Sequence, residues 1–129
     1  MAIRVVRLGS PRTPGEGLRI GTVRRPPRGV PKSEHASRDF YDAWLPELAP
    51  SEDLVQQAMQ ARDERAWNAF VRRYRAEMKR PEAARLLALL AALSHQANLS
   101  VGCYCEDEAR CHRSELRTLL EEAGGSVPP

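Results

Sequence analysis

The order of apolar and polar positions predicts short strands on either side of a helical stretch. Residues 3–8 are mostly apolar and β-branched and are followed by a glycine and a proline, which predicts a strand. Apolar and polar side chains alternate over residues 18–23, and this predicts a second strand, which we expect to lie beside the first. Residues 99–104 form a third apolar run, which we expect to be a central strand.

Between the second and third strands, apolar side chains recur at three- and four-residue steps, the spacing of one helix face. Ser51 and Asp63 are suited to be N-caps, so we expect helices to begin after each of them. Pro81 ends the second helix and opens a third, which continues to residue 96 and is apolar on nearly all sides. We expect this third helix to be largely buried. A last helix is predicted over residues 112–123, where two glycines end it.

This order of elements is typical of an α/β protein. We expect one layered domain over residues 1–125, with a small, mostly parallel or mixed sheet flanked by about four helices. Residues 126–129 are expected to form a disordered tail. The chain of 129 residues is long enough for one domain, and it shows no internal repeat.

The composition and the start of the chain predict where in the cell the protein is located. The chain is 42% hydrophobic and 29% charged, as in an ordinary globular domain, which excludes collagen and disordered acidic tails. The longest apolar run, residues 86–93, is far shorter than the ~20 residues that span a bilayer. The charged start of the chain lacks the apolar core of a signal peptide. We therefore expect a cytoplasmic protein with no membrane contact and with reduced cysteines.

The charge is distributed unevenly along the chain. Residues 1–32 contain eight bases and one acid, a net charge of +7, whereas the rest contains 12 bases and 16 acids, a net charge of −4. A basic segment predicts an anionic partner, which is a small molecule, a nucleic acid or an acidic surface of the same fold. No nucleic-acid-binding motif accompanies these bases. Arg24, Arg25, Arg28 and Gly29 lie in one proline-rich loop and are candidates for an anion-binding pocket, the alternative being a solvated loop.

All three cysteines lie within nine residues, where the last strand passes through a loop into the last helix. Ligands bind at such carboxyl ends of strands in open α/β sheets. A helix N-terminus and neighbouring cations lower the pKa of a thiol. One hypothesis is therefore a thiolate site in which Cys105 or Cys111 reacts, His112 transfers protons and Arg113 binds an anion.

Two other hypotheses account for the same cluster. Cys103, Cys105, Cys111 and His112 are four ligands of the kind that bind zinc or iron, although their spacing is not that of paired zinc knuckles. The third hypothesis is structural, because free cysteines are often buried and Cys103 fits a core strand.

Five short motifs, taken together, resemble the YeaO-like branch of domain-of-unknown-function family 488. They are Arg7-Leu8-x-x-Pro11, Gly17-Leu18-Arg19-Ile20, Arg24-Arg25-Pro26-Pro27-Arg28-Gly29, Arg73-Tyr74-Arg75-Ala76-Glu77, and Cys105-Glu106 with Cys111-His112-Arg113. The resemblance covers nearly the whole chain. It implies a compact α/β domain of the bacterial cytosolic type and carries over no activity.

The leading hypothesis is thus a small enzyme whose cysteines, His112 and arginines bind and modify an anionic small molecule. It requires that the loop over residues 24–29 and the cluster over residues 105–113 meet at one edge of the sheet. The alternative is a metal-binding or redox-sensing regulatory module that uses residues 103–112. The third class is a nucleic-acid-binding protein.

Overall fold

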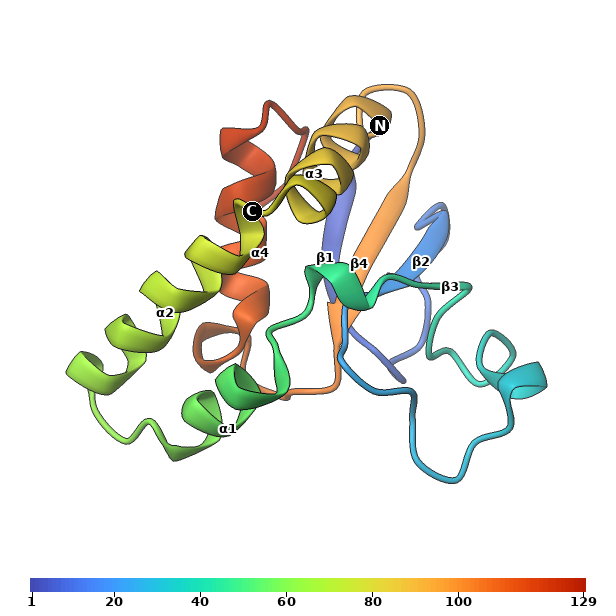
Figure 1. Ribbon diagram of the computed structural model, residues 1–129. Coiled ribbons are helices and arrows are strands. Elements are labelled where there is room, and N and C mark those ends of the chain that lie inside the picture. Colours follow the sequence, from blue (N-terminus) through green and yellow to red (C-terminus); the bar gives the residue numbers. More distant parts are fainter.

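The computed structural model describes residues 1–129 and shows an α/β fold with four strands and four α-helices (Figure 1). The strands are β1 (Ile3–Arg7), β2 (Leu18–Gly21), β3 (Ala43–Trp44) and β4 (Leu99–Cys103). The α-helices are α1 (Glu52–Gln60), α2 (Glu64–Met78), α3 (Pro81–Leu93) and α4 (His112–Glu122). Short 3-10 helices occupy Lys32–Glu34, Pro46–Leu48 and Glu108–Arg110. The predicted fold class is confirmed.

The sheet is parallel throughout, and its strand order is β1-β4-β2-β3. The prediction that β4 is central is confirmed: all five of its residues are buried. The expectation that β2 lies beside β1 is wrong, because β4 pairs with both and places Leu99 opposite Ile3 on one side and Leu18 on the other. The most apolar strand thereby gains two pairing partners and is covered on both edges.

The main core lies on one face of the sheet, where α2, α3 and α4 gather (Figure 1). Ile3, Ile20 and Val101 belong to this core, since alternate residues of a strand point to the same face. The helices contribute the buried side chains of Leu54, Phe70, Tyr74, Leu87, Leu90, Leu116 and Leu120. Asp63 caps α2 as predicted, because its side chain accepts a hydrogen bond from the Ala66 amide.

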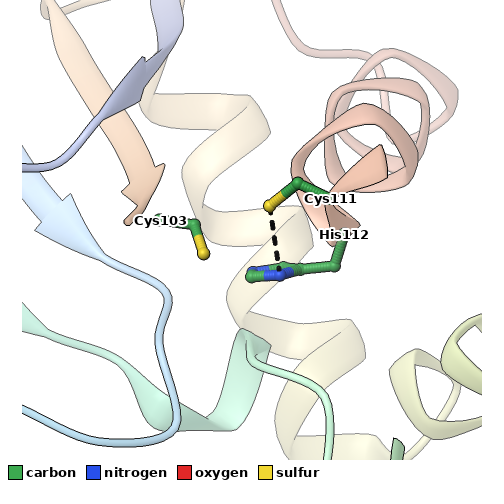
Figure 2. Close-up of side chains that lie close together, drawn as sticks. All are labelled: Cys103, Cys111 and His112. Carbon is green, nitrogen blue, oxygen red and sulfur yellow. Dashed lines mark hydrogen bonds between the residues drawn. The ribbon is translucent and has the colours of Figure 1, made fainter. Parts of the chain in front are cut away.

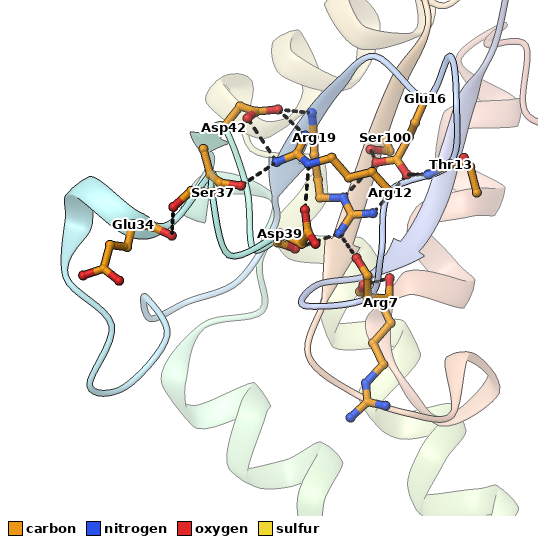
Figure 3. A network of polar contacts seen from close by, with 12 residues as sticks. Arg7, Arg12, Thr13, Glu16, Arg19, Glu34, Ser37, Asp39, Asp42 and Ser100 are labelled. Atoms are coloured by element: carbon orange, nitrogen blue, oxygen red, sulfur yellow. Dashed lines mark hydrogen bonds and ion pairs between the residues drawn. The ribbon is translucent and has the colours of Figure 1, made fainter.

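The other face of the sheet is covered by coil. A Cβ atom on Gly21 would lie 2.3 Å from the ring of Tyr41, so this close approach requires glycine. Arg19 is fully buried on this face, where Glu16 accepts two of its hydrogen bonds at 2.8 and 2.9 Å (Figure 3). Part of the N-terminal positive charge is therefore neutralised inside the fold.

The expectation that the third helix is largely buried is wrong. Helix α3 ends at Leu93 and buries one side only, with Leu89 54% and Leu93 38% exposed. Its neighbours are α4, α2 and the 3-10 helix Pro46–Leu48, and they pack against that one side. At the C-terminus, the Ser126 carbonyl accepts a hydrogen bond from the Ile3 amide at 2.8 Å, and the Ser126 amide donates to Ser94 Oγ. The first residue of edge strand β1 needs such an acceptor. None of the helices has the length and apolar character required to cross a bilayer.

Candidate functional site

A cavity of about 790 Å³ opens at the carboxyl ends of the adjacent strands β2 and β4. Most of its lining comes from four segments: the loop after β2, helix α1, the end of β4 with the loop after it, and the start of α4. Phe40 and Phe70 complete the lining. The structure thus brings the arginine loop and the cysteine–histidine cluster together at one edge of the sheet. The members of the two sets that line the cavity are Arg24, Arg25, Arg28, Cys103, Cys105, Cys111 and His112.

Three sulfur atoms and one imidazole converge on the floor of this cavity. Cys103 is the last residue of β4, and its Sγ lies 3.8 Å from Sγ of Cys105. The ligand atoms of Cys103, Cys111 and His112 all lie within 4.8 Å of one another (Figure 2). Cys103 and Cys111 are 8% and 3% exposed, whereas Cys105 is exposed. The cluster therefore has two buried thiols and one that solvent reaches freely.

The orientation of His112 is fixed by a hydrogen bond to the backbone just after β2. Its Nε2 lies 2.8 Å from the carbonyl oxygen of Thr22, which follows β2. A carbonyl can only accept, so Nε2 carries a proton and the neutral ring presents the Nδ1 lone pair elsewhere. That atom lies 3.7 Å from Cys111 Sγ. The geometry makes His112 a base positioned against the Cys111 thiol.

The thiols also shift one another's pKa values. The pKa of Cys103 is raised, first by its contacts with Cys105 and Cys111 and then by burial. The pKa of Cys105 is lowered, first by the hydrogen bond from Cys103. The pKa of Cys111 is also lowered, by Cys103 first and further by His112, although Cys105 and burial act in the opposite direction. Cys103 thus keeps its proton, and the cluster favours a thiolate on a neighbour.

The place of Cys111 in the chain favours its thiolate form as well. It is the N-cap residue of α4, and no side chain caps this helix. The free amides and the dipole of a helix N-terminus stabilise a negative charge in the first turn. The strand-to-helix junction predicted from the sequence therefore has the expected local structure.

Arg113 does not line the cavity, unlike the arginines of the loop. It is 3% exposed, and one terminal nitrogen donates to the Cys105 carbonyl at 2.6 Å. Its Nε is buried without a partner. In this structure Arg113 positions the loop that carries Cys105, and its charge contributes to the lowered pKa of that thiol.

The loop arginines differ in their freedom to bind a ligand. Arg24 donates to the carbonyls of Pro50 and Ala49 at 3.0 and 3.1 Å, so it connects the loop to the start of α1. Arg25 is paired with Glu52. Arg28 has no hydrogen-bond or ion-pair partner in the protein. Gly29 lies outside the cavity lining, with open space around its Cα.

Two residues that line the cavity, Arg110 and Met59, were not among the predicted site residues. Arg110 lines the cavity and lies 5.7 Å from the ring centre of Trp67, a cation–π arrangement. Its position next to Cys111 was the available signal. Met59 is 74% exposed at the cavity, and no pattern in the sequence distinguishes it from a core residue.

The same floor has the dimensions of a metal site. In a tetrahedral zinc site with Zn–S bonds of about 2.3 Å, sulfur ligands lie about 3.8 Å apart. Cys103 Sγ and Cys105 Sγ are 3.8 Å apart, and Cys111 Sγ and His112 Nδ1 are 3.7 Å apart. The bond from His112 to a backbone carbonyl is also typical of a metal-ligating imidazole.

A comparison with protein families places the chain in a group. The family model described as "Active DUF488-N3 subclade" matches residues 3–124 of the chain. The chain therefore belongs to the DUF488 family, and the family resemblance inferred from its motifs is confirmed. No curated protein and no solved structure matches it.

Proposed function

We propose that the protein is an enzyme in which Cys111 attacks an anionic small molecule. One observation carries the proposal: the Thr22 carbonyl holds His112 so that its Nδ1 lies against Cys111 Sγ inside the cavity. An imidazole in this position removes the thiol proton and stabilises the resulting thiolate. The same ring returns the proton to a leaving group later in the reaction.

The preference for an anion rests on the arginines around the cavity. Arg28 and Arg110 both line it and are exposed, and Arg28 has all its donors free of protein partners. Of the two acids in the lining, Glu52 is already paired with Arg25, and Asp53 lies in the first turn of α1. Arg110 is paired with Glu64 at 3.7 Å, so the lining charges without an ionic partner are Arg24, Arg28 and Asp53. Their sum is positive, which attracts carboxylates and phosphates.

Arg28→Ala is expected to reduce the preference of Cys111 for an anionic electrophile. The measurement is the ratio of its labelling rates with iodoacetate and with neutral iodoacetamide, by peptide mass spectrometry. Loss of one charged hydrogen bond should lower this ratio about tenfold. Arg38→Ala is the matched control, since Arg38 is exposed and lies outside the cavity lining. An unchanged ratio in Arg28→Ala would show that Arg28 does not bind the anion.

A second function is favoured by the interatomic distances at the cavity floor. Cys103, Cys111 and His112 offer two sulfurs and a nitrogen to a metal ion, with Cys105 as the nearest further ligand. Thiolate and imidazole ligands suit zinc or iron. Such a metal would make the protein a metal-binding module.

Elemental analysis of the protein separates the two functions. If the metal function holds, the protein carries one equivalent of zinc or iron, and His112→Asn lowers this to near zero. His95→Asn is the matched control, because His95 lies outside the cavity and binds the Gly124 carbonyl. A metal-free protein with a reactive Cys111 excludes the second function.

We do not extend the proposal to nucleic acids. Four of the eight bases in residues 1–32 form ion pairs within the chain. They are Arg7, Arg12, Arg19 and Arg25. These pairs leave fewer free charges for phosphate contacts than the sequence indicated.

A further inference from the structure

Cys103 and Cys105 form a pair of thiols that the proposed reaction does not use as nucleophiles. Residues two apart at the end of a strand point to the same side, and the two Sγ atoms here are 3.8 Å apart. That distance is van der Waals contact between sulfurs. A disulfide bond is about 2.0 Å long, so the two sulfurs must come closer for a bond to form, and Cys105 lies in exposed coil, where such a movement meets little packing.

The two thiols differ in their access to solvent. Cys105 is exposed, so a small oxidant reaches it directly. Cys103 is 8% exposed and lies behind it at the end of β4. An accessible thiol next to a protected one is the arrangement in which the first is oxidised and the second forms a disulfide with it.

The backbone around Cys105 is anchored on both sides. Arg113 donates to the Cys105 carbonyl at 2.6 Å, and the Tyr104 hydroxyl donates to the Arg25 carbonyl at 2.9 Å. These contacts join the loop after β4 to α4 and to the arginine loop. They keep the two sulfurs adjacent while the rest of the loop is open to solvent.

We propose that Cys105 is a site of reversible oxidation by hydroperoxides, and that Cys103 resolves the oxidised sulfur as an intramolecular disulfide. In the first step the Cys105 sulfur attacks the terminal oxygen of the hydroperoxide, an S–O bond forms and the O–O bond breaks. The leaving oxygen takes the proton of the Cys105 thiol and departs as an alcohol, or as water when the oxidant is hydrogen peroxide. In the second step the Cys103 sulfur attacks the Cys105 sulfur, the S–S bond forms, and hydroxide leaves with the Cys103 proton as water. Two thiols lose two electrons, and the hydroperoxide gains them.

This site goes beyond the reaction proposed for Cys111. It needs neither His112 nor an anionic substrate. An external thiol restores the reduced state by exchange at the exposed Cys105 sulfur. Because both cysteines line the cavity, the disulfide changes the cavity floor, and oxidation is thereby coupled to the same pocket.

The test treats the protein as purified with hydrogen peroxide and maps the products by peptide mass spectrometry. The expected main product is a Cys103–Cys105 disulfide that dithiothreitol reverses. In Cys103→Ser, Cys105 should instead give a sulfenic acid that dimedone traps, and its irreversible sulfinic acid should increase by about tenfold or more. Cys103 is a core residue, so Cys103→Ala serves as a second variant with a smaller polar change.

Two results would overturn the inference. One is formation of sulfinic acid on Cys105 at equal rates in the native protein and in both Cys103 variants. The other is a disulfide from Cys105 to Cys111 as the main product. His112→Asn separates this inference from the proposed function. It should leave the yield of the Cys103–Cys105 disulfide unchanged, whereas it should slow the alkylation of Cys111.

Discussion

His112→Asn is expected to slow the alkylation of Cys111 by iodoacetamide at neutral pH, by up to about 30-fold. A thiol with the ordinary pKa of about 8.5 is only roughly 3% thiolate at pH 7, and the contact of His112 Nδ1 with Cys111 Sγ at 3.7 Å is one of the causes that lower this pKa. Asparagine fills part of the space but has no titratable nitrogen. The effect is therefore chemical, and circular dichroism should show that the fold is retained.

Its control uses a histidine in a similar chemical setting. His95 also places Nε2 on a backbone carbonyl, that of Gly124 at 2.7 Å, but it lies outside the cavity. His95→Asn should leave the labelling of Cys111 unchanged. Equal rates in native protein and His112→Asn would mean that His112 does not activate the thiol.

Glu16→Ala is expected to lower the free energy of unfolding by about 3–5 kcal/mol, the range for removing one partner of a buried ion pair. Glu16 and Arg19 are 3% and 0% exposed, and the carboxylate also accepts a hydrogen bond from Ser100 at 2.7 Å. Without it the Arg19 guanidinium keeps its charge in the interior. Urea unfolding measures the loss.

The matched control removes an acid from an exposed pair. Glu122 is 54% exposed and binds Arg75 at 2.9 Å, so Glu122→Ala should cost only about 0–1 kcal/mol. If Glu16→Ala and Glu122→Ala destabilise equally, the buried pair is not a main source of stability.

At acid pH, Glu16 should contribute less to the free energy of unfolding. Burial alone would raise the pKa of this carboxyl, but the hydrogen bonds from Arg19 and Ser100 hold it below the ordinary value of 4.5. A lowered folded pKa means that the stabilisation is fully present above 4.5 and is lost as the pH falls through the folded value. The difference between native protein and Glu16→Ala should therefore shrink in acid.

Local patterns predicted the elements better than their arrangement. The apolar run at residues 99–104 predicted a central strand because a strand buried on both faces is apolar at every position. The neighbour of β1 was not predictable, since pairing of parallel strands depends on contacts far apart in sequence. Leu89 was expected to be buried with the rest of its helix but is exposed. The apolar sequence of a helix does not show on how many sides other elements will pack against it.

In the candidate site too, features that are local in the sequence were predicted and features that depend on distant residues were not. The cluster of Cys105, Cys111 and His112 was visible because these residues are close in the sequence. The partner that orients His112 is the Thr22 carbonyl, 90 residues away, and backbone atoms leave no residue-type signal. Glu16 lies in a loop rich in glycine and proline that is typical of exposed positions, so its burial against Arg19 could not be predicted.

The most direct test of the account is the pH dependence of Cys111 alkylation, followed by peptide mass spectrometry in native protein and in His112→Asn. Hydrogen bonding from Cys103 and the contact with His112 lower the pKa of this thiol, so labelling of the native protein should reach its plateau at a lower pH than labelling of an ordinary thiol. The His112→Asn plateau should begin at higher pH. A rate that rises about tenfold per unit up to the ordinary thiol pKa of about 8.5, identically in both proteins, would contradict the account.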